Sequence, residues 1–155
     1  MLLGSLALLA GCGFELRRER ELHFRSLALV GFVPASPLAA EIKRQIERTQ
    51  AKLVENPAAA EVVLEVKREL RDKAVVVSTS AGQVREWQLR LHFDFLLRTA
   101  GGEIILPRKD MLLTRELTFT ETAALGKSPE EAALYRAMQS DAVAQVMSHL
   151  AAVKL

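Results

Sequence analysis

The residue with the most specific chemistry in this sequence is Cys12, the only cysteine of the chain. It ends the run Leu-Ala-Gly-Cys at residues 9–12, after an apolar and uncharged stretch from Met1 to Ala10. A signal peptidase needs small side chains before its cleavage point, and a thiol is the group on which a thioether to diacylglycerol forms. About ten apolar residues are too few to cross a hydrocarbon core, which needs roughly 20. The pattern predicts a cleaved lipoprotein signal peptide over residues 1–11, with a covalent lipid on Cys12.

The alternative for this segment is a buried N-terminal strand or helix that carries a free cysteine in the core. The position of the motif and the presence of a single cysteine favour the lipoprotein interpretation. Gly13 follows Cys12, at a place where an aspartate would favour retention at the inner membrane. Several acyl chains hold a protein firmly, whereas one chain binds only marginally. We therefore expect a chain anchored by lipid at the periplasmic face of the outer membrane.

The remaining polar residues form no catalytic or metal-binding motif in the sequence. His23, His92 and His149 show no paired ligand spacing, and zinc-protease, phosphate-loop and nucleophile-elbow motifs are absent from the sequence. A single cysteine excludes an internal disulfide and a multi-cysteine metal site. His92 and Asp94 share a strand face, but neither a nucleophile nor a pocket is implied. We expect no catalysis, no metal site and no cofactor besides the lipid.

Composition places the chain among ordinary globular proteins. The sequence has 155 residues, which after removal of residues 1–11 is enough for one domain with its own core. Its 21 basic and 19 acidic side chains give a formal net charge of +2. Nucleic-acid-binding domains usually carry a strong basic excess and aromatic platforms for bases. The near balance of charge and the low aromatic content of 5% therefore argue against a nucleic-acid partner.

Hydrophobic periodicity predicts two amphipathic helices. The first is expected over residues 37–52, with Ser36 as its N-cap and a proline in first position. The second is expected to begin at a capping box, Ser128 with Glu131, and to run to about Val153. Met138 and Met147 lie on the apolar stripe of this second helix, where core packing is a better interpretation than a ligand groove.

Stretches of β-branched and alternating apolar residues predict four strands. The clearest lies at 84–99, where alternate residues from Trp87 to Leu97 are apolar. Its polar face is either open to solvent or in contact with another surface, and consists of Arg85, Gln88, Arg90, His92 and Asp94. The other strands are expected at 26–32, at 61–79 with an interruption at Lys73, and at 103–120 with an interruption at 107–110.

Packing these elements predicts an α+β two-layer sandwich. Two helices would cover one face of a mainly antiparallel four-stranded sheet, because this arrangement buries both helical stripes and the apolar strand faces. The expected organisation is a signal peptide at 1–11, a charged lipidated tether at 12–25 and a single domain at 26–155.

Several short motifs, in order along the mature chain, resemble the lipopolysaccharide-assembly lipoprotein LptE family. Residues 12–17 (Cys-Gly-Phe-Glu-Leu-Arg) resemble the start of the mature family sequence, and residues 82–89 resemble a Gly-x-x-x-Glu-Tyr-x-Leu motif, with Trp87 at the usual tyrosine. Residues 115–119 resemble an Arg-x-aromatic-x-Tyr/Phe stretch, and residues 138–147 resemble a Met-x-x-Asp…Gln-Ile-Leu helix. Each motif alone is weak, whereas their order and spacing are fairly specific.

The resemblance implies a role without catalysis. Proteins of this family are expected to sit inside the lumen of the LptD outer-membrane β-barrel as a plug, to help the barrel assemble, and to assist delivery of lipopolysaccharide to the cell surface. The family fold, two helices on a four-stranded sheet, agrees with the sandwich predicted above. A second interpretation is a periplasmic lipoprotein subunit of another lipid-transport system. A third, a lipoprotein hydrolase, lacks any triad or metal motif.

Lipopolysaccharide offers phosphates and acyl chains, so a surface that binds it should combine basic and apolar side chains. The resemblance points to basic residues near the hairpin turn and in the loop before the last helix. Lys127 lies in that loop. Arg85 lies near the turn, where the sequence has Thr and Ser at 79–80 in place of a basic residue, and Arg115 is a third candidate. For each of the three the alternative is a solvated surface charge.

Overall fold

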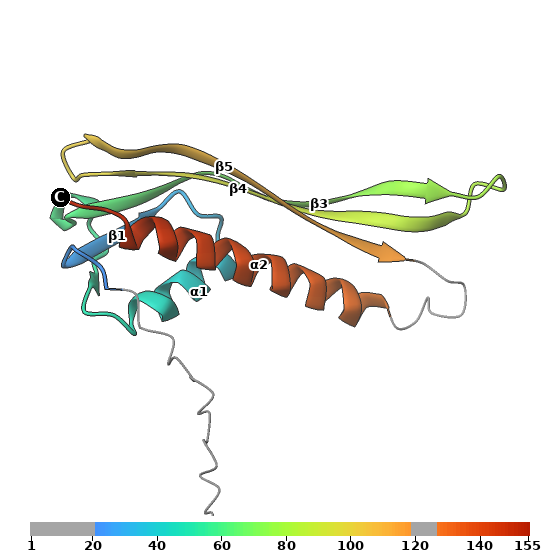
Figure 1. Ribbon diagram of the computed structural model, residues 1–155, viewed down its shortest axis with the longest axis horizontal. Helices are drawn as coiled ribbons and strands as arrows, with labels where there is room; N and C mark the ends of the chain where they lie inside the picture. The colour runs from blue at the N-terminus through green and yellow to red at the C-terminus, as the bar shows by residue number, and fades with distance from the viewer. Residues whose placement is uncertain (1–20, 119–126) are drawn as a thin grey trace, which may run out of the picture.

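The computed structural model describes residues 21–118 and 127–155, with the backbone only for Lys127 and Ser128. Figure 1 shows a long sheet with both helices on one side of it. The described part of the chain contains, in order, β1 (Ser26–Val30), α1 (Pro37–Ile46), β2 (Lys52–Leu53), the 3-10 helix η1 (Pro57–Ala59), β3 (Val62–Ser78), β4 (Val84–Arg98), β5 (Ile104–Thr118) and α2 (Lys127–Ala151).

The described residues form a five-stranded mixed sheet in the order β2-β1-β3-β4-β5. β1 is parallel to both β2 and β3, whereas β3, β4 and β5 are antiparallel. The two-layer α+β arrangement with two helices is therefore confirmed, but the expectation of four mainly antiparallel strands is wrong in detail. A two-residue strand such as β2 is too short to carry a periodic signal. The crossover through α1 makes β2 parallel to β1.

The three antiparallel strands are longer and less interrupted than the sequence suggested. β3 continues through Lys73, and β5 continues through residues 107–110. A register shift that faces Phe95 and Leu97 across the β4–β5 pair lies near the expected break in β5, and a second shift lies on β3 between Val66 and Arg68, whereas β3 pairs regularly with β4 at Lys73. Such bulges increase the local twist of a sheet. They flank β4 at the same level, so the sheet bends there without ending.

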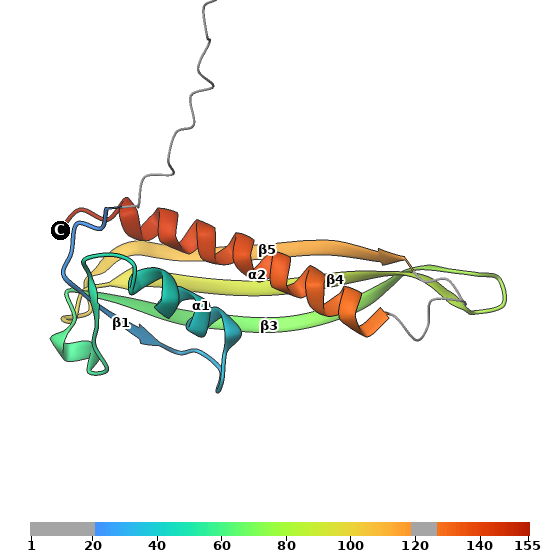
Figure 2. The ribbon, with the colours of Figure 1, turned by 90° about the horizontal axis from the view of Figure 1, so that it is seen from below.

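We call the part of the sheet that carries β1 and α1 the proximal half. The distal half comprises residues 71–78 of β3, 84–91 of β4 and 113–118 of β5. Figure 2 shows that α2 crosses both halves obliquely, whereas α1 lies only over the proximal half. The β3–β4 hairpin then projects beyond the end of α2 (Figures 1 and 2). The two halves therefore have different coverings.

The main core lies between the sheet and the two helices. Alternate residues of β4 from Leu89 to Leu97 are fully buried, as the alternation predicted. Phe93 stacks on Phe95 with ring centroids 5.7 Å apart, and Phe32 lies 6.0 Å from Phe93. The helices contribute their apolar stripes, which include both methionines expected in the core: Leu38, Ile42, Ile46, Met138, Ala142, Val143, Val146, Met147 and Leu150.

The core also extends toward the N-terminus beyond the expected domain boundary. Leu22 and Phe24 are only 3% and 2% exposed and belong to the main core cluster. Both residues lie within the tether predicted at 12–25, because charged neighbours on either side hide their alternation. The folded domain thus begins before Ser26. The signal peptide and residues 12–20 of the tether lie outside the described residues.

The predicted start of α1 is confirmed by its hydrogen bonds. The backbone N–H of Ala39 donates to Ser36 Oγ at 3.0 Å, which is the expected N-cap. The Ser36 hydroxyl in turn donates to Glu69 Oε1 at 2.7 Å, so the cap is also attached to β3. The helix ends at Ile46, six residues before the expected end, where the hydroxyl of Thr49 donates to the Ile46 carbonyl at 2.7 Å.

Gly31, just after β1, is required by a close approach of two backbones. Its φ is +82°, and a Cβ at this position would overlap the carbonyl oxygen of Val66 at the β3 bulge. Glycine alone combines a positive φ with the absence of a side chain. The glycine therefore lets β1 end directly against the bend of the sheet.

Candidate functional site

The helix-facing side of the distal half presents basic side chains rather than a continuous apolar layer. Lys73, Leu89 and Arg115 form one row across β3, β4 and β5. Lys73 Nζ lies 3.0 Å from the Glu131 carboxylate of α2 and 5.3 Å from the centre of the Trp87 ring. The outer ends of this row are thus basic, with a buried leucine between them.

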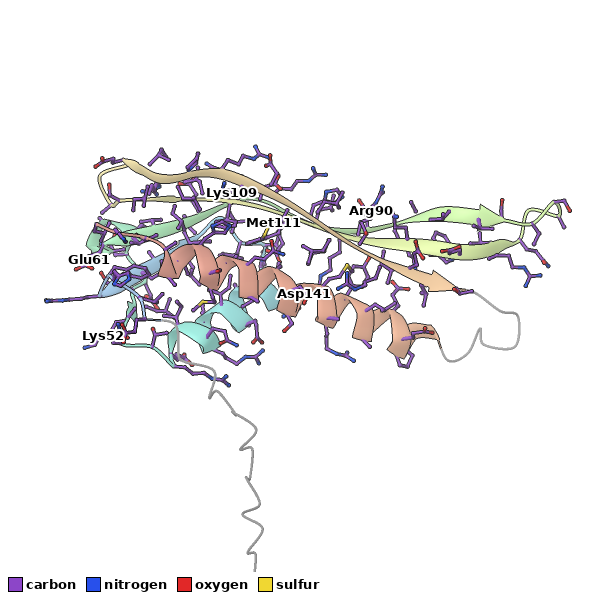
Figure 3. All side chains as sticks on the ribbon, viewed as in Figure 1. Lys52, Glu61, Arg90, Lys109, Met111 and Asp141 are labelled. Carbon is purple, nitrogen blue, oxygen red and sulfur yellow. The ribbon has the colours of Figure 1, made fainter. Side chains whose placement is uncertain are left out.

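Arg115 is attached to α2 on the opposite side of this row. Its Nη2 lies 2.6 Å from Asp141 Oδ2, and its Nη1 donates to the Thr114 carbonyl at 2.8 Å. Figure 3 shows Asp141 on the stretch of α2 that lies beneath the sheet. The Arg115 side chain is 41% exposed and that of Asp141 is 52% exposed, so the pair is partly open to water and contributes modestly to stability.

Tyr135 and Gln139 hold α2 against β3 on the same side. The Tyr135 hydroxyl donates to the Asp72 carbonyl at 2.7 Å, and the Arg71 guanidinium lies 5.4 Å from the centre of the tyrosine ring. Arg71 also donates to Gln139 Oε1 at 3.0 Å. Burial, followed by the nearby Glu131 carboxylate, raises the pKa of Tyr135 above its ordinary value of 10.0. Aromatic and polar contacts therefore add to the apolar packing of Leu89, Leu91 and Leu117 under this part of α2.

Beyond α2, the β3–β4 hairpin exposes a run of aliphatic side chains. Val75, Val76 and Val77 are 48%, 51% and 43% exposed. Arg85, also exposed, lies on the paired strand next to a register shift near the end of the hairpin. We call Lys73, the three valines and Arg85 the distal hairpin site. It combines exposed apolar surface with positive charge: Lys73, at the base of the site, is paired with Glu131 of α2, and the hairpin beyond it projects from the body (Figure 1).

The face of the sheet without helices, here called the outer face, carries paired charges. Arg90 Nε lies 2.5 Å from Asp72 Oδ1, and His92 Nε2 lies 3.4 Å from Asp72 Oδ2. The hydrogen bond from Arg90 is the main cause that lowers the pKa of the Asp72 carboxyl. The Asp94 carboxylate is buried against the Arg108 guanidinium at 2.6 Å. In Figure 3, Arg90 lies on the opposite side of the sheet from Asp141.

The structure brings some of the predicted site residues together and separates others. Arg85 lies in the projecting hairpin, and α2 starts at Lys127 at the same end of the sheet (Figures 1 and 2), although the side chain of Lys127 and the Ser128 capping box lie outside the described part. Arg115 lies further along β5, in its pair with Asp141. Cys12 lies outside the described residues.

Lys73 and the three valines are not among the site residues that the sequence predicts. Lys73 is expected there only as an interruption of the strand at 61–79, and the structure shows a continuous strand with the valines exposed. Four consecutive small or β-branched apolar residues have the same pattern in a strand covered by a helix and in one open to solvent. The sequence therefore does not show how much of the hairpin is exposed. The basic residue that precedes the valine run was the available signal.

No group of three or more His, Cys, Asp or Glu side chains within residues 21–118 and 127–155 could hold a metal ion. No helix in these ranges combines the length and the apolar character needed to span a bilayer.

The fold and the site define a class of protein: a two-layer α+β domain with a basic and aliphatic hairpin that projects from it. Within this class the chain belongs to the LptE lipopolysaccharide-assembly family, whose model matches residues 24–150. That range covers every described strand and almost all of α2. The resemblance inferred from the sequence is therefore confirmed, and the family is one of lipopolysaccharide-assembly lipoproteins without a catalytic role.

Solved structures similar to the chain include bacterial lipoproteins. A solution structure of an uncharacterized lipoprotein B from Nitrosomonas europaea is 30% identical, with a TM-score of 0.76 over 90% of this chain and 91% of that one. The rare lipoprotein B from Shewanella oneidensis has the same fold at 18% identity, with a TM-score of 0.66 over 83% and 95%. A minor lipoprotein from Acinetobacter baumannii shares it at 19% identity, with a TM-score of 0.68 over 84% and 93%. No curated protein sequence matches the chain.

Proposed function

We propose that this protein is an outer-membrane lipoprotein that assembles lipopolysaccharide at the cell surface together with an LptD-type β-barrel. The observation that supports this role most directly is the distal hairpin site, in a chain that belongs to the lipopolysaccharide-assembly family. Lipopolysaccharide carries phosphates beside acyl chains. Valines next to lysine and arginine match both parts of such a ligand.

Within this site we assign different contacts to different residues. The three exposed valines would contact acyl chains, because their covering by lipid removes apolar surface from water. Arg85 would contact a phosphate, and Lys127 at the start of α2 would contribute a second positive charge. Arg115 would act less directly, because its guanidinium is already paired with Asp141.

The partnership with a barrel rests on shape and anchoring. β4 has 15 residues and therefore spans roughly 50 Å at about 3.4 Å per residue. The apolar band of an outer-membrane barrel is about 25 Å tall, so an elongated body of this kind could reach through a lumen as a plug. A lipid on Cys12 would hold the body at the membrane. The first described residues lie at the end of the molecule opposite the hairpin tip (Figure 1).

The barrel partnership is tested by purification from native membranes. The protein carrying its lipid should co-purify with an outer-membrane β-barrel, and its depletion should lower lipopolysaccharide at the cell surface. Cys12→Ser should prevent lipid addition, which mass spectrometry of the mature protein measures directly. Recovery of inner-membrane transporter subunits alone, with normal surface lipopolysaccharide after depletion, would instead support a subunit of another lipid-transport system.

The ligand assignment is tested by binding to immobilised lipopolysaccharide. Arg85→Glu and Lys127→Glu should each weaken binding by about tenfold, because a charge-assisted hydrogen bond is replaced by repulsion. Val76→Asp should weaken it by a similar factor. Arg68→Glu is the matched control, because Arg68 is also exposed but lies on the proximal half. Equal losses for Arg85→Glu and Arg68→Glu would show that only net charge matters and would reject the site.

A further inference from the structure

The connection between β1 and α1 carries an exposed apolar turn. Val33 is 45% exposed, and Pro34 and Ala35 are exposed beside it. Residues 31–40 contain no charged side chain, although charged residues make up 26% of the chain. In Figure 2 this connection reaches further sideways than β1, β3 or α1, on the side of the sheet away from β5. We call Val33, Pro34 and Ala35 the lateral turn.

The backbone of the lateral turn is fixed by a hydrogen bond within it. The Ser36 N–H donates to the Val33 carbonyl at 3.1 Å, and Ala35 has a φ of +55°. These are features of a type II turn, in which proline is favoured at the second position and glycine at the third. Alanine at the third position costs conformational free energy that glycine would not. Among the described residues, Ala35 is the single non-glycine residue with a positive φ, and such strain is concentrated at functional sites.

Two other elements of the fold hold the lateral turn in place. On β3, the Glu69 carboxylate accepts hydrogen bonds from the Val33 N–H at 3.4 Å and from the Ser36 hydroxyl at 2.7 Å. On α2, Gln139 Nε2 donates to the Pro37 carbonyl, just after the turn, at 2.9 Å. The shape of the lateral turn is therefore formed before any partner binds.

The chemistry of the lateral turn fits an apolar partner surface. Its side chains are aliphatic, and few of its backbone donors would lose water on contact. Pro34 has no N–H, and the N–H groups of Val33 and Ser36 are already bonded within the protein. A preformed shape favours a protein pocket over acyl chains, because fluid chains adapt to any apolar surface and gain nothing from a fixed turn.

The position of the lateral turn along the molecule points to the wall of the barrel partner. Glu69, which holds the turn, lies roughly 24 Å from the start of β3 and roughly 31 Å from its end, at about 3.4 Å per residue. A body that spans the lumen lengthwise therefore carries the turn well within the barrel, whose apolar band is about 25 Å tall. A sideways projection at this height meets the inner wall, which separates it from the bilayer.

Building on the barrel partnership proposed above, we propose that the lateral turn docks into an apolar recess on the inner wall of the β-barrel and sets the rotational position of the plug. The interior of such barrels is mostly polar, so an apolar recess offers a specific place where the turn can be buried. A lipid at one end and an elongated body leave rotation about the long axis open. One lateral contact removes that freedom.

Co-purification of the full, lipidated chain in competition with the wild type tests this contact. Two differently tagged copies are produced together in native cells, and the share of each in barrel complexes is measured. Val33→Asp should be recovered at least about tenfold less than the wild type, because its carboxylate would be buried in an apolar recess. Val76→Asp is the matched control. Val76 is 51% exposed, but it lies in the hairpin assigned above to acyl chains, so this variant should keep its share.

Thermal unfolding checks that both variants are folded. Their melting temperatures should stay within about 4 °C of the wild-type value, because both valines are exposed.

Cross-linking provides a second measurement that does not depend on the aspartate. The lipid occupies the sulfur of Cys12, so Pro34→Cys provides the only free thiol of the mature chain. A photoactivatable benzophenone attached to this thiol should cross-link to the barrel. The same group on Val76→Cys should cross-link to lipopolysaccharide.

Equal recovery of Val33→Asp and the wild type, or a cross-link from position 34 to lipopolysaccharide alone, would overturn the docking of the lateral turn and leave the barrel partnership standing. Absence of any barrel from complexes of the wild-type protein would overturn the barrel partnership as well.

Discussion

The proximal and distal halves of the sheet use the same strands but are stabilised by different interactions. In the proximal half, Phe93 and Phe95 are fully buried between β4 and the helices. In the distal half the core continues only through smaller side chains such as Leu89 and Leu117, and α2 is also held by the Tyr135 hydrogen bond and by ion pairs whose side chains remain partly exposed. The hairpin beyond it leaves valines open to water.

This difference separates the part that specifies the fold from the part that is available for binding. Burial of large side chains accounts for most of the free energy of folding. Exposed aliphatic residues contribute little to stability and offer apolar surface to a ligand or partner. Substitutions of the exposed hairpin residues should therefore lower the free energy of unfolding much less than substitutions in the proximal core.

The largest effect should come from the aromatic stack of the proximal half. Phe93→Ala should lower the free energy of unfolding by about 3–5 kcal/mol, because it removes a fully buried ring and leaves a cavity. Val76→Ala in the exposed hairpin should change it by less than about 0.5 kcal/mol. Chemical denaturation measures both. Similar losses for the two variants would show that the hairpin is as well packed as the core.

The close approach of β1 to the bulge should give the next largest effect. Gly31→Ala should cost more than about 2 kcal/mol, because a positive φ and an overlap with the Val66 carbonyl act together. The matched control is Gly82→Ala in the hairpin turn, where φ is also positive but no atom lies within 4 Å of the added Cβ. That variant should cost only about 1 kcal/mol. Equal costs would exclude the overlap as a cause.

Tyr135 should make the stability of the distal half dependent on alkaline pH. Its folded-state pKa is raised, so its contribution is complete below the ordinary value of 10.0 and is lost as pH rises through the folded value. The protein has one tyrosine, so absorbance reports this ionisation alone. Tyr135→Phe should cost about 1 kcal/mol at neutral pH and remove this part of the pH dependence. An unshifted tyrosine titration would contradict the prediction.

The smallest effect should come from the exposed ion pair between Lys73 and Glu131. Glu131→Gln should cost no more than about 0.5 kcal/mol, and the cost should shrink as salt is added. Denaturation at low and high ionic strength measures this. A loss above about 2 kcal/mol, independent of salt, would mean that the pair is buried and that the distal half has a core of its own.

The proximal half was also the part that sequence reasoning described best. Alternation over residues 87–97 predicted both the strand and the buried face, because one side of β4 meets the core. The start of α1 followed from the Ser36 cap. The two-residue β2 was not predicted because a segment this short carries no periodic pattern, and the burial of Leu22 and Phe24 was not predicted because charged neighbours hide their alternation.

The distal half was predicted less well for a physical reason. Lys73 and Pro107 suggested interruptions, but an exposed lysine on a helix-facing row and a proline on an edge strand are both tolerated in a continuous sheet. Arg85 was correctly placed near the turn. Whether Arg115 is open or paired depends on Asp141, which lies 26 residues away along the chain.

The alternation of side chains in the projecting β3–β4 hairpin also limits how the length of this hairpin can change. Adding one residue to each strand would exchange the two faces, since side chains alternate with period two. Insertions that preserve the faces must therefore come in pairs on both strands, and each such step lengthens the hairpin by about 7 Å. Relatives with hairpins of different length should consequently differ by discrete increments, with the bulges and the buried rings of the proximal half unchanged.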